Sequence, residues 1–174
     1  AYFNSLINKP KNYSFKFEKI KIPTRWNDEF YNSSNNIDNF SYKNSNEIIL
    51  ISKKITSGKI NSKILFDGKN IFTTDVDGNL IIYSINEQKI IFKYNFYKKK
   101  YKKIIKKLNI IIDNSKVYVA DNIGFIYAID YENKKLIWAL NNKIPFRSNI
   151  KIFKNNLLLA DQDNTIHVIS KTDG

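Results

Sequence analysis

The sequence contains no cysteine and no methionine, and these absences exclude several kinds of site. Without cysteine the chain forms no disulfide, no thiolate metal site and no cysteine nucleophile. His167 is the only histidine, so a zinc site or a nucleophile–base relay would lack partners. No apolar run approaches the roughly 20 residues that cross a bilayer as a helix. Because Met is missing even at position 1, we expect the chain to start at a processed or cut end.

Arginine is almost absent, although the chain carries a formal net charge of +13. Arg25 and Arg147 are the only two, so the basicity comes from lysine. An AT-rich genome, whose codons favour lysine, isoleucine and asparagine, explains this composition better than a nucleic-acid-binding surface, since such a surface usually relies on arginine for bidentate contacts. The charge still favours attraction to acidic partners or anionic lipid.

Two segments of the chain align with each other without a gap. Residues 64–92 match residues 110–138 at an offset of 46, and a third copy, 150–174, follows the second at an offset of 40. The matched positions are Asp75, Asp121 and Asp161, then Gly78, Gly124 and Asn164, and finally the aromatic pair Phe92 and Trp138. Self-similarity at a fixed period indicates a repeat architecture.

Each copy predicts short strands separated by tight turns, because Gly, Asn and Asp recur where positive φ is needed. We expect strands at 64–66, 70–74, 80–85 and 89–93, then at 110–112, 116–120, 125–130 and 135–140, and in the third copy at 150–152, 156–160 and 165–170. Four antiparallel strands at a period of 40 to 46 residues are typical of a propeller blade. The predicted fold class is therefore all-β, a partial β-propeller of about three recognisable four-stranded antiparallel blades.

A single blade cannot bury both of its faces, so blades must stack on one another. Strands inside a stack are covered on both sides, which explains apolar runs such as 157–159. The large side chains of Phe92 and Trp138 favour an aromatic ring of one blade packing on its neighbour. Because only a closed ring removes sheet edges, we expect this chain to be part of a larger ring.

We predict one domain, 1–174, with repeats at 64–109, 110–149 and 150–174. The segment 1–63 is less regular. Alternating apolar residues predict strands at 15–22 and 47–55, and the Asn- and Ser-rich stretch 27–46 predicts a loop between them.

The second copy carries a resemblance to a known repeat. Tyr127-Ala128-Ile129-Asp130 and Lys135-Leu136-Ile137-Trp138 resemble the repeat of the PQQ-like propellers, which ends in a closing Trp. Asn133-Lys134 stands where that repeat usually has Thr-Gly, and the first copy has Phe92 in place of the Trp. The resemblance covers 64–174.

Residues 144–148, read Ile-Pro-Phe-Arg-Ser, and the turn Ala160-Asp161-Gln162-Asp163-Asn164 are similar to elements of BamB-type outer-membrane assembly lipoproteins, especially the alphaproteobacterial form. This resemblance implies a non-enzymatic periplasmic scaffold of eight blades that holds no cofactor and is tethered to the outer membrane by a lipidated cysteine. Its partner would be the periplasmic domains of the outer-membrane barrel insertase, with no nucleic acid and no small-molecule substrate. The chain departs from the family in having no cysteine and about half the blades.

The acidic turn residues and His167 invite a catalytic or metal-binding interpretation. Asp75 to Asn79 resembles the start of a calcium loop, but Asn86 occupies the position of the ligating Glu. Recurrence at one repeat position instead favours carboxylates that cap backbone N–H groups. We interpret eight repeat positions as structural: Asp75, Gly78, Phe92, Asp121, Gly124, Trp138, Asp161 and Asn164. His167 is interpreted as a partly buried strand residue.

Two other functions stay open at this point. The PQQ-like superfamily includes quinoprotein dehydrogenases, whose adjacent cysteines this chain lacks, so a fragment of such an enzyme is one alternative. A basic propeller that binds nucleic acid or anionic surfaces is the other.

The segments between the copies are the candidate binding sites. Residues 98–107 hold seven lysines in ten residues, and they predict either a solvated loop, with Tyr101, Ile104 and Ile105 against the blade, or a basic patch. In 144–148, an Arg beside Pro and Phe offers a rigid contact of the kind enriched in interfaces, unless Phe146 packs inward. The partner-binding candidates are Pro145, Phe146, Arg147, Lys98, Lys99, Lys100, Lys102 and Lys103.

Overall fold

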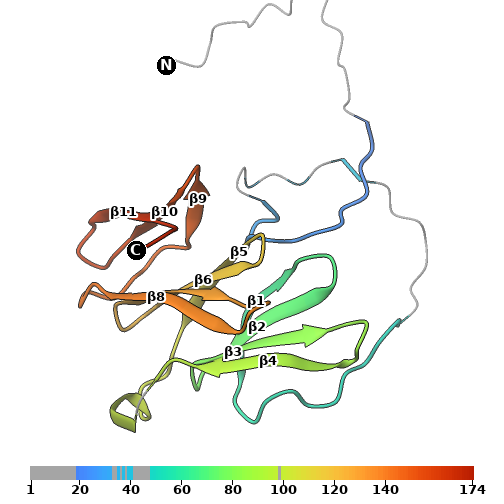
Figure 1. Cartoon of the computed structure of the whole chain (residues 1–174), viewed down its shortest axis with the longest axis horizontal. Helices are drawn as coiled ribbons and strands as arrows, with labels where there is room; N and C mark the ends of the chain where they lie inside the picture. The colour runs from blue at the N-terminus through green and yellow to red at the C-terminus, as the bar shows by residue number, and fades with distance from the viewer. Residues whose placement is uncertain (1–18, 33–34, 36, 38, 41–47, 98) are drawn as a thin grey trace, which may run out of the picture.

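The computed structural model describes residues 19–32, 35, 37, 39–40, 48–97 and 99–174 (Figure 1). Within these ranges the chain is all-β, which confirms the predicted fold class, and its one helical element is the single 3-10 turn η1, Lys99–Tyr101. No helix in the described part is long and apolar enough to cross a membrane.

The strands form three antiparallel meanders, one for each repeat (Figure 1). The first sheet holds β1 (Ile60–Phe66), β2 (Asn70–Asp75), β3 (Asn79–Ser84) and β4 (Lys89–Asn95). The second holds β5 (Leu108–Asp113), β6 (Lys116–Asp121), β7 (Phe125–Asp130) and β8 (Lys135–Asn141). The third holds β9 (Lys151–Phe153), β10 (Asn156–Ala160) and β11 (Ile166–Ser170).

The repeat extends to a shared irregularity in strand pairing. The register shifts between Ile82 and Tyr83 in the β3–β4 pair, and between Ala128 and Ile129 in the β7–β8 pair. These positions are equivalent in the alignment of the first two copies. The fourth strand therefore has the same irregularity in both blades, which is typical of a β-bulge that belongs to the repeat.

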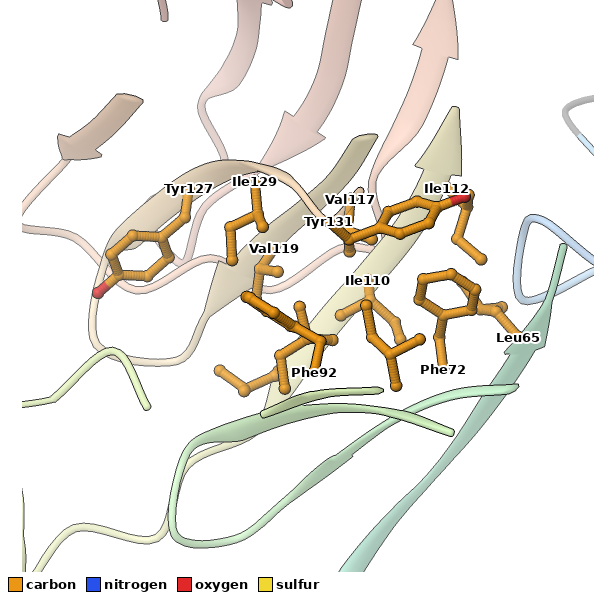
Figure 2. Close-up of a cluster of buried hydrophobic side chains, with 13 residues drawn as sticks. Leu65, Phe72, Phe92, Ile110, Ile112, Val117, Val119, Tyr127, Ile129 and Tyr131 are labelled. Atoms are coloured by element: carbon orange, nitrogen blue, oxygen red, sulfur yellow. The ribbon is translucent and has the colours of Figure 1, made fainter. Parts of the chain in front are cut away.

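The second sheet is covered on both faces, as stacking of blades requires. One face packs on the first sheet in the cluster of Figure 2, and its residues include Ile110, Ile112, Val117, Val119 and Ile129. The opposite face packs on the third sheet through Ile111, Tyr118, Ala120, Ile126 and Ala128. Since successive side chains of a strand point to opposite faces, two apolar faces produce the continuous apolar runs seen in the sequence.

The two aromatic repeat positions lie at these interfaces. Phe92 of β4 is buried in the cluster between the first and second sheets. Trp138 of β8 packs against the cluster between the second and third sheets, and its indole N–H donates to the carbonyl of Lys171 at 3.1 Å. Each ring therefore contacts the blade that follows its own.

Two predicted strands in the N-terminal segment are wrong where they can be compared. Residues 19–22 and 48–55 contain no strand, while 15–18 and 47 lie outside the described residues. Ile48, Ile49 and Ile51 are 77%, 94% and 79% exposed. A segment of alternating apolar and polar residues forms a strand only when a neighbouring strand offers a free edge. None of the described strands pairs with this segment.

Residues 26–28, just before and at the start of the segment predicted as a loop at 27–46, form ordered contacts. Trp26 forms an antiparallel bridge with Phe66 at the end of β1, and the Ile112 N–H donates to the carbonyl of Asn27. Asp28 is buried and forms an ion pair of 2.7 Å with Lys151 of β9. This short segment thus touches the first strand of all three sheets, which places those strands beside one another.

The outer face of the third sheet is open. Ile166 and Val168 are 75% and 64% exposed, although their counterparts in the second sheet, Ile126 and Ala128, are fully buried by the third sheet. An apolar face of this kind is what a further blade would cover.

This difference predicts unequal costs for the same truncation. Ile126→Ala is expected to lower the free energy of unfolding by about 3 kcal/mol, because it leaves a cavity between two sheets. Ile166→Ala at the equivalent open position is expected to cost less than about 0.5 kcal/mol. Urea unfolding of the two variants measures both values, and equal losses would contradict the stacking.

Candidate functional site: the linker rim

The segments that join the blades lie on one rim of the molecule together with the β2–β3, β6–β7 and β10–β11 turns. We call this surface the linker rim and define it by residues 75–79, 96–97, 99–107, 121–125, 142–149 and 161–165. The Lys106 N–H donates to the carbonyl of Val76, and the Phe146 N–H donates to that of Asp121. Each linker is therefore bonded to the turn of the blade that it leaves.

A buried aspartate organises each turn on this rim. Asp75, Asp121 and Asp161 are each 2% exposed or less. The Oδ1 atom of each accepts backbone N–H groups from the residues two and four positions later, at 2.8 to 3.0 Å. These bonds satisfy donors that the turn would otherwise leave unpaired.

The second carboxylate oxygen accepts from the segment that enters the blade. Asp75 Oδ2 accepts from the Thr56 hydroxyl at 2.6 Å, and Asp121 Oδ2 accepts from the Tyr97 hydroxyl at 2.5 Å. Asp161 Oδ2 accepts from the Asn142 side-chain amide at 3.3 Å. One residue thus joins the turn of a blade to the linker that leads into it.

The pKa values of two of these carboxyl groups reflect their bonds. Burial alone would raise the pKa of Asp75, but hydrogen bonds from Thr56 and Asn79 hold it below the usual range. The hydrogen bond with His167 lowers the pKa of Asp161. Both groups are therefore anions at neutral pH, and the environment favours the charged form.

His167 lies on β11 and serves the same aspartate. Its Nε2 is 2.7 Å from Asp161 Oδ2, and because an ionised carboxylate can only accept, Nε2 carries the hydrogen. Its ring stands edge-on to Phe146 at 5.6 Å. Within the described residues no group of three or more His, Cys, Asp or Glu side chains is placed to hold a metal ion.

The turn glycines lie where only a small residue fits. Gly78 has a φ of 89°, and an added Cβ would come within 2.3 Å of the Tyr97 ring. Gly124 has a φ of 105°, and its Cβ would meet the Ile144 carbonyl at 2.9 Å. Asn164 holds the corresponding place in the third turn with a φ of 63°. The glycines therefore let each linker pass directly over a turn.

The lysine-rich linker is only partly a solvated loop. Lys98 lies outside the described residues, Lys99 and Lys100 belong to η1, and Lys102 and Lys103 are exposed. Tyr101 packs on Tyr97 and Phe125 as expected. Ile104 and Ile105 are 44% and 66% exposed, so the expectation that they pack against the blade is wrong. Lys106 instead is buried, at 3% exposure.

In the second linker the three candidate residues differ in their exposure to solvent. Phe146 is 3% exposed and belongs to the cluster between the second and third sheets, so its ring packs inward rather than toward a partner. Pro145 is half-buried, and its carbonyl accepts from the Gln162 N–H at 3.0 Å. The side chain of Arg147 is exposed, while its backbone N–H donates to the Ala160 carbonyl at 2.9 Å. The accessible candidate is therefore Arg147.

Sequence reasoning missed the linker residues that bond the turn aspartates. Thr56, Tyr97 and Asn142 precede their aspartates by 19, 24 and 19 residues. A side-chain donor at a nearly constant distance before the repeated Asp was visible in the sequence, but its identity changes from copy to copy.

Comparison with solved structures places this arrangement among propellers. A europium-containing methanol dehydrogenase superposes with a TM-score of 0.63 at 13% identity over 85% of this chain. BamB from Moraxella catarrhalis gives 0.46 at 15% identity over 57%, and the computationally designed Ika8 protein gives 0.49 at 12% identity over 62%. No protein-family model and no curated protein sequence matches the chain.

The superposition on the methanol dehydrogenase shows the fold and nothing finer. The chain spans 28% of the methanol dehydrogenase, 28% of the BamB chain and 32% of the designed protein. Together with the three stacked sheets, the superposition on the methanol dehydrogenase shows that the chain folds as part of a β-propeller.

The turn aspartates predict a specific loss of stability. Asp161→Asn replaces an acceptor oxygen with an NH₂ group that faces hydrogen-bond donors, so unfolding free energy is expected to fall by about 2 kcal/mol. Asp163→Asn, an exposed acid in the same turn, is the control and is expected to change it by less than about 0.5 kcal/mol. Urea midpoints of the two variants distinguish them, and indistinguishable midpoints would contradict the role of Asp161.

The same carboxylates predict a pH dependence. Because the folded pKa values of Asp75 and Asp161 are lowered, their contribution is complete above the unfolded value of about 3.9 and is lost as pH falls through the folded values. Stability is expected to decline below about pH 4, and the decline should be shallower in the double variant Asp75→Asn, Asp161→Asn. Urea unfolding between pH 2 and 7 measures it, and parallel curves would count against this explanation.

Proposed function

We propose that this chain is part of a non-enzymatic propeller scaffold that binds a protein partner through its linker rim. By the resemblance of 144–148 and 160–164 to BamB-type proteins, the partner proposed is the set of periplasmic domains of the outer-membrane barrel insertase. The site of action proposed is the periplasm, with attachment to the outer membrane through the longer protein.

The observation that carries this proposal is the way in which Arg147 is presented. Its guanidinium side chain is exposed, while its backbone N–H is bonded to Ala160 and the preceding ring of Phe146 is buried against His167. An arginine on a backbone that is already ordered binds a partner with little loss of conformational entropy. Arg147 is also one of only two arginines in a chain that otherwise uses lysine.

The fate of the other polar groups on the rim supports a binding role over catalysis. The buried turn aspartates and His167 are occupied by hydrogen bonds to backbone and linker groups. General acid–base chemistry needs such a group within reach of a substrate, whereas these carboxylates hold loops in place. The exposed linker side chains remain for contact with a partner.

The test is capture of this chain by purified periplasmic domains of the insertase. Arg147→Ala is expected to weaken the affinity about tenfold, and Arg147→Lys should recover only part of it, because lysine lacks the planar fork of donors. Lys135→Ala removes one exposed positive charge at the start of β8, away from the linker rim, and is expected to change the affinity less than about twofold.

Two outcomes would contradict the proposal. Equal capture by wild type and Arg147→Ala would remove Arg147 from the interface, and no capture by the intact longer protein would remove the partner. Quinone-dependent dye reduction by that longer protein would instead favour the quinoprotein alternative.

A further inference from the structure

We propose that a hollow beside the lysine-rich linker binds a phosphate group, carried by a soluble phosphate or by a lipid headgroup. The hollow has a volume of about 370 Å³ and is lined by Asp77, Asn95, Tyr97, Lys99, Lys102 and Lys106. It lies where the first linker crosses the β2–β3 turn. This site lies on the linker rim, and Arg147 is not among its lining residues.

The central observation is a buried lysine without a counter-ion. Lys106 is 3% exposed, and no carboxylate among the described residues lies within ion-pair distance of its ammonium group. Its Nζ lies 5.3 Å from the centroid of the Tyr97 ring, and the backbone N–H of Lys106 donates to the carbonyl of Val76. The Lys106 Nζ atom is not among the fully buried polar atoms that lack a partner, so the ammonium group reaches the hollow, where an anion would pair with it.

The wall that holds Lys106 is rigid. The Tyr97 hydroxyl donates to Asp121 at 2.5 Å, and the ring lies over Gly78, where an added Cβ would come within 2.3 Å. Burial, and then the charge of Asp121, raises the pKa of Tyr97, so the hydroxyl keeps its hydrogen and stays a donor. The Asn95 side chain bonds the carbonyl of Asp77 at 3.0 Å and accepts from the Tyr97 N–H at 2.9 Å. The cavity therefore exists before any ligand arrives.

Two further ammonium groups border the hollow from the linker. Lys99 starts η1, and Lys102 follows it by three residues, with its N–H bonded to the Lys99 carbonyl at 3.1 Å. In a 3-10 turn residues three apart lie on the same side, so both side chains border the hollow. Lys103, the next residue, is exposed and does not line it.

The charge of the lining indicates the class of ligand. Three ammonium groups against the one carboxylate of Asp77 leave two positive charges, 3 − 1 = 2. A phosphate monoester carries about −1.5 to −2 at neutral pH, and its oxygens accept several donors at once. Three lysines around one concave site fit that charge and number of acceptors, whereas a cation would be repelled.

The first experiment measures binding of inorganic phosphate and glycerol 3-phosphate to the chain by ³¹P line broadening and calorimetry. Wild type is expected to bind both saturably at one site. Lys106→Met, which keeps the length of the side chain, should weaken binding at least tenfold without loss of folded protein. Saturable binding that Lys106→Met leaves unchanged would overturn the proposal.

The variants Lys102→Gln and Lys103→Gln form a matched pair, and neither changes the buried residue Lys106. Each removes one positive charge, and the two residues are neighbours, so general attraction to anions falls equally. Lys102→Gln is expected to weaken binding three- to tenfold and Lys103→Gln less than twofold. Equal effects would show attraction to the basic surface as a whole and would overturn a built site.

Vesicles distinguish the two sources of phosphate. Co-sedimentation with phosphatidylglycerol vesicles, against phosphatidylcholine as the control, is expected to depend on Lys102 and not on Lys103 if the headgroup enters the hollow. Binding of the soluble phosphates without vesicle binding assigns the site to a soluble phosphate. If neither the soluble phosphates nor the vesicles bind, the phosphate proposal is overturned. Capture by the insertase domains through Arg147 is expected to be unaffected by Lys106→Met. Failure of phosphate binding is therefore distinguishable from failure of the scaffold function.

Discussion

The carboxylate at the end of the second strand of each blade forms hydrogen bonds in two directions. One oxygen accepts hydrogen bonds from backbone N–H groups of the following turn. The other accepts a hydrogen bond from a side chain in the segment that enters the blade. A buried carboxylate is tolerated because these donors satisfy it, and the same donors fix the path of the linker over the turn. The second and third blades are thereby connected to their predecessors by more than apolar packing, and the linker rim has a defined shape.

The surfaces proposed for binding follow from that arrangement. A linker held at both ends presents its remaining side chains from an ordered backbone, as Arg147 shows in the second linker. The first linker is six residues longer than the second, as the repeat offsets of 46 and 40 show. Its Tyr97 is bonded to Asp121, and the ring of Tyr97 and the side chain of Lys106 line a hollow beside it. Differences between linkers, rather than the shared blade, carry the candidate functions.

The repeat made the blades predictable from the sequence, since the strands of the second copy are bounded by turn residues whose positive φ the structure shows, such as Asn114 and Gly124. The unpaired segment 48–55 was not predictable, because a strand depends on an available neighbour as well as on alternation. Sequence also could not decide whether Phe146 faces inward, because an aromatic residue in a linker suits a core and an interface equally. The burial of Lys106 was likewise hidden, since a lysine inside a lysine-rich run is expected to be solvated.

The most direct test of this account is a double-mutant cycle between Tyr97 and Asp121, which joins the first linker to the second blade. Tyr97→Phe removes only the donor, and Asp121→Asn removes the charged acceptor. The account predicts a coupling free energy of about 1 to 3 kcal/mol from urea unfolding of wild type, both single variants and the double variant. A coupling free energy near zero, with the two single losses simply adding, would show that the turn aspartate does not hold the linker.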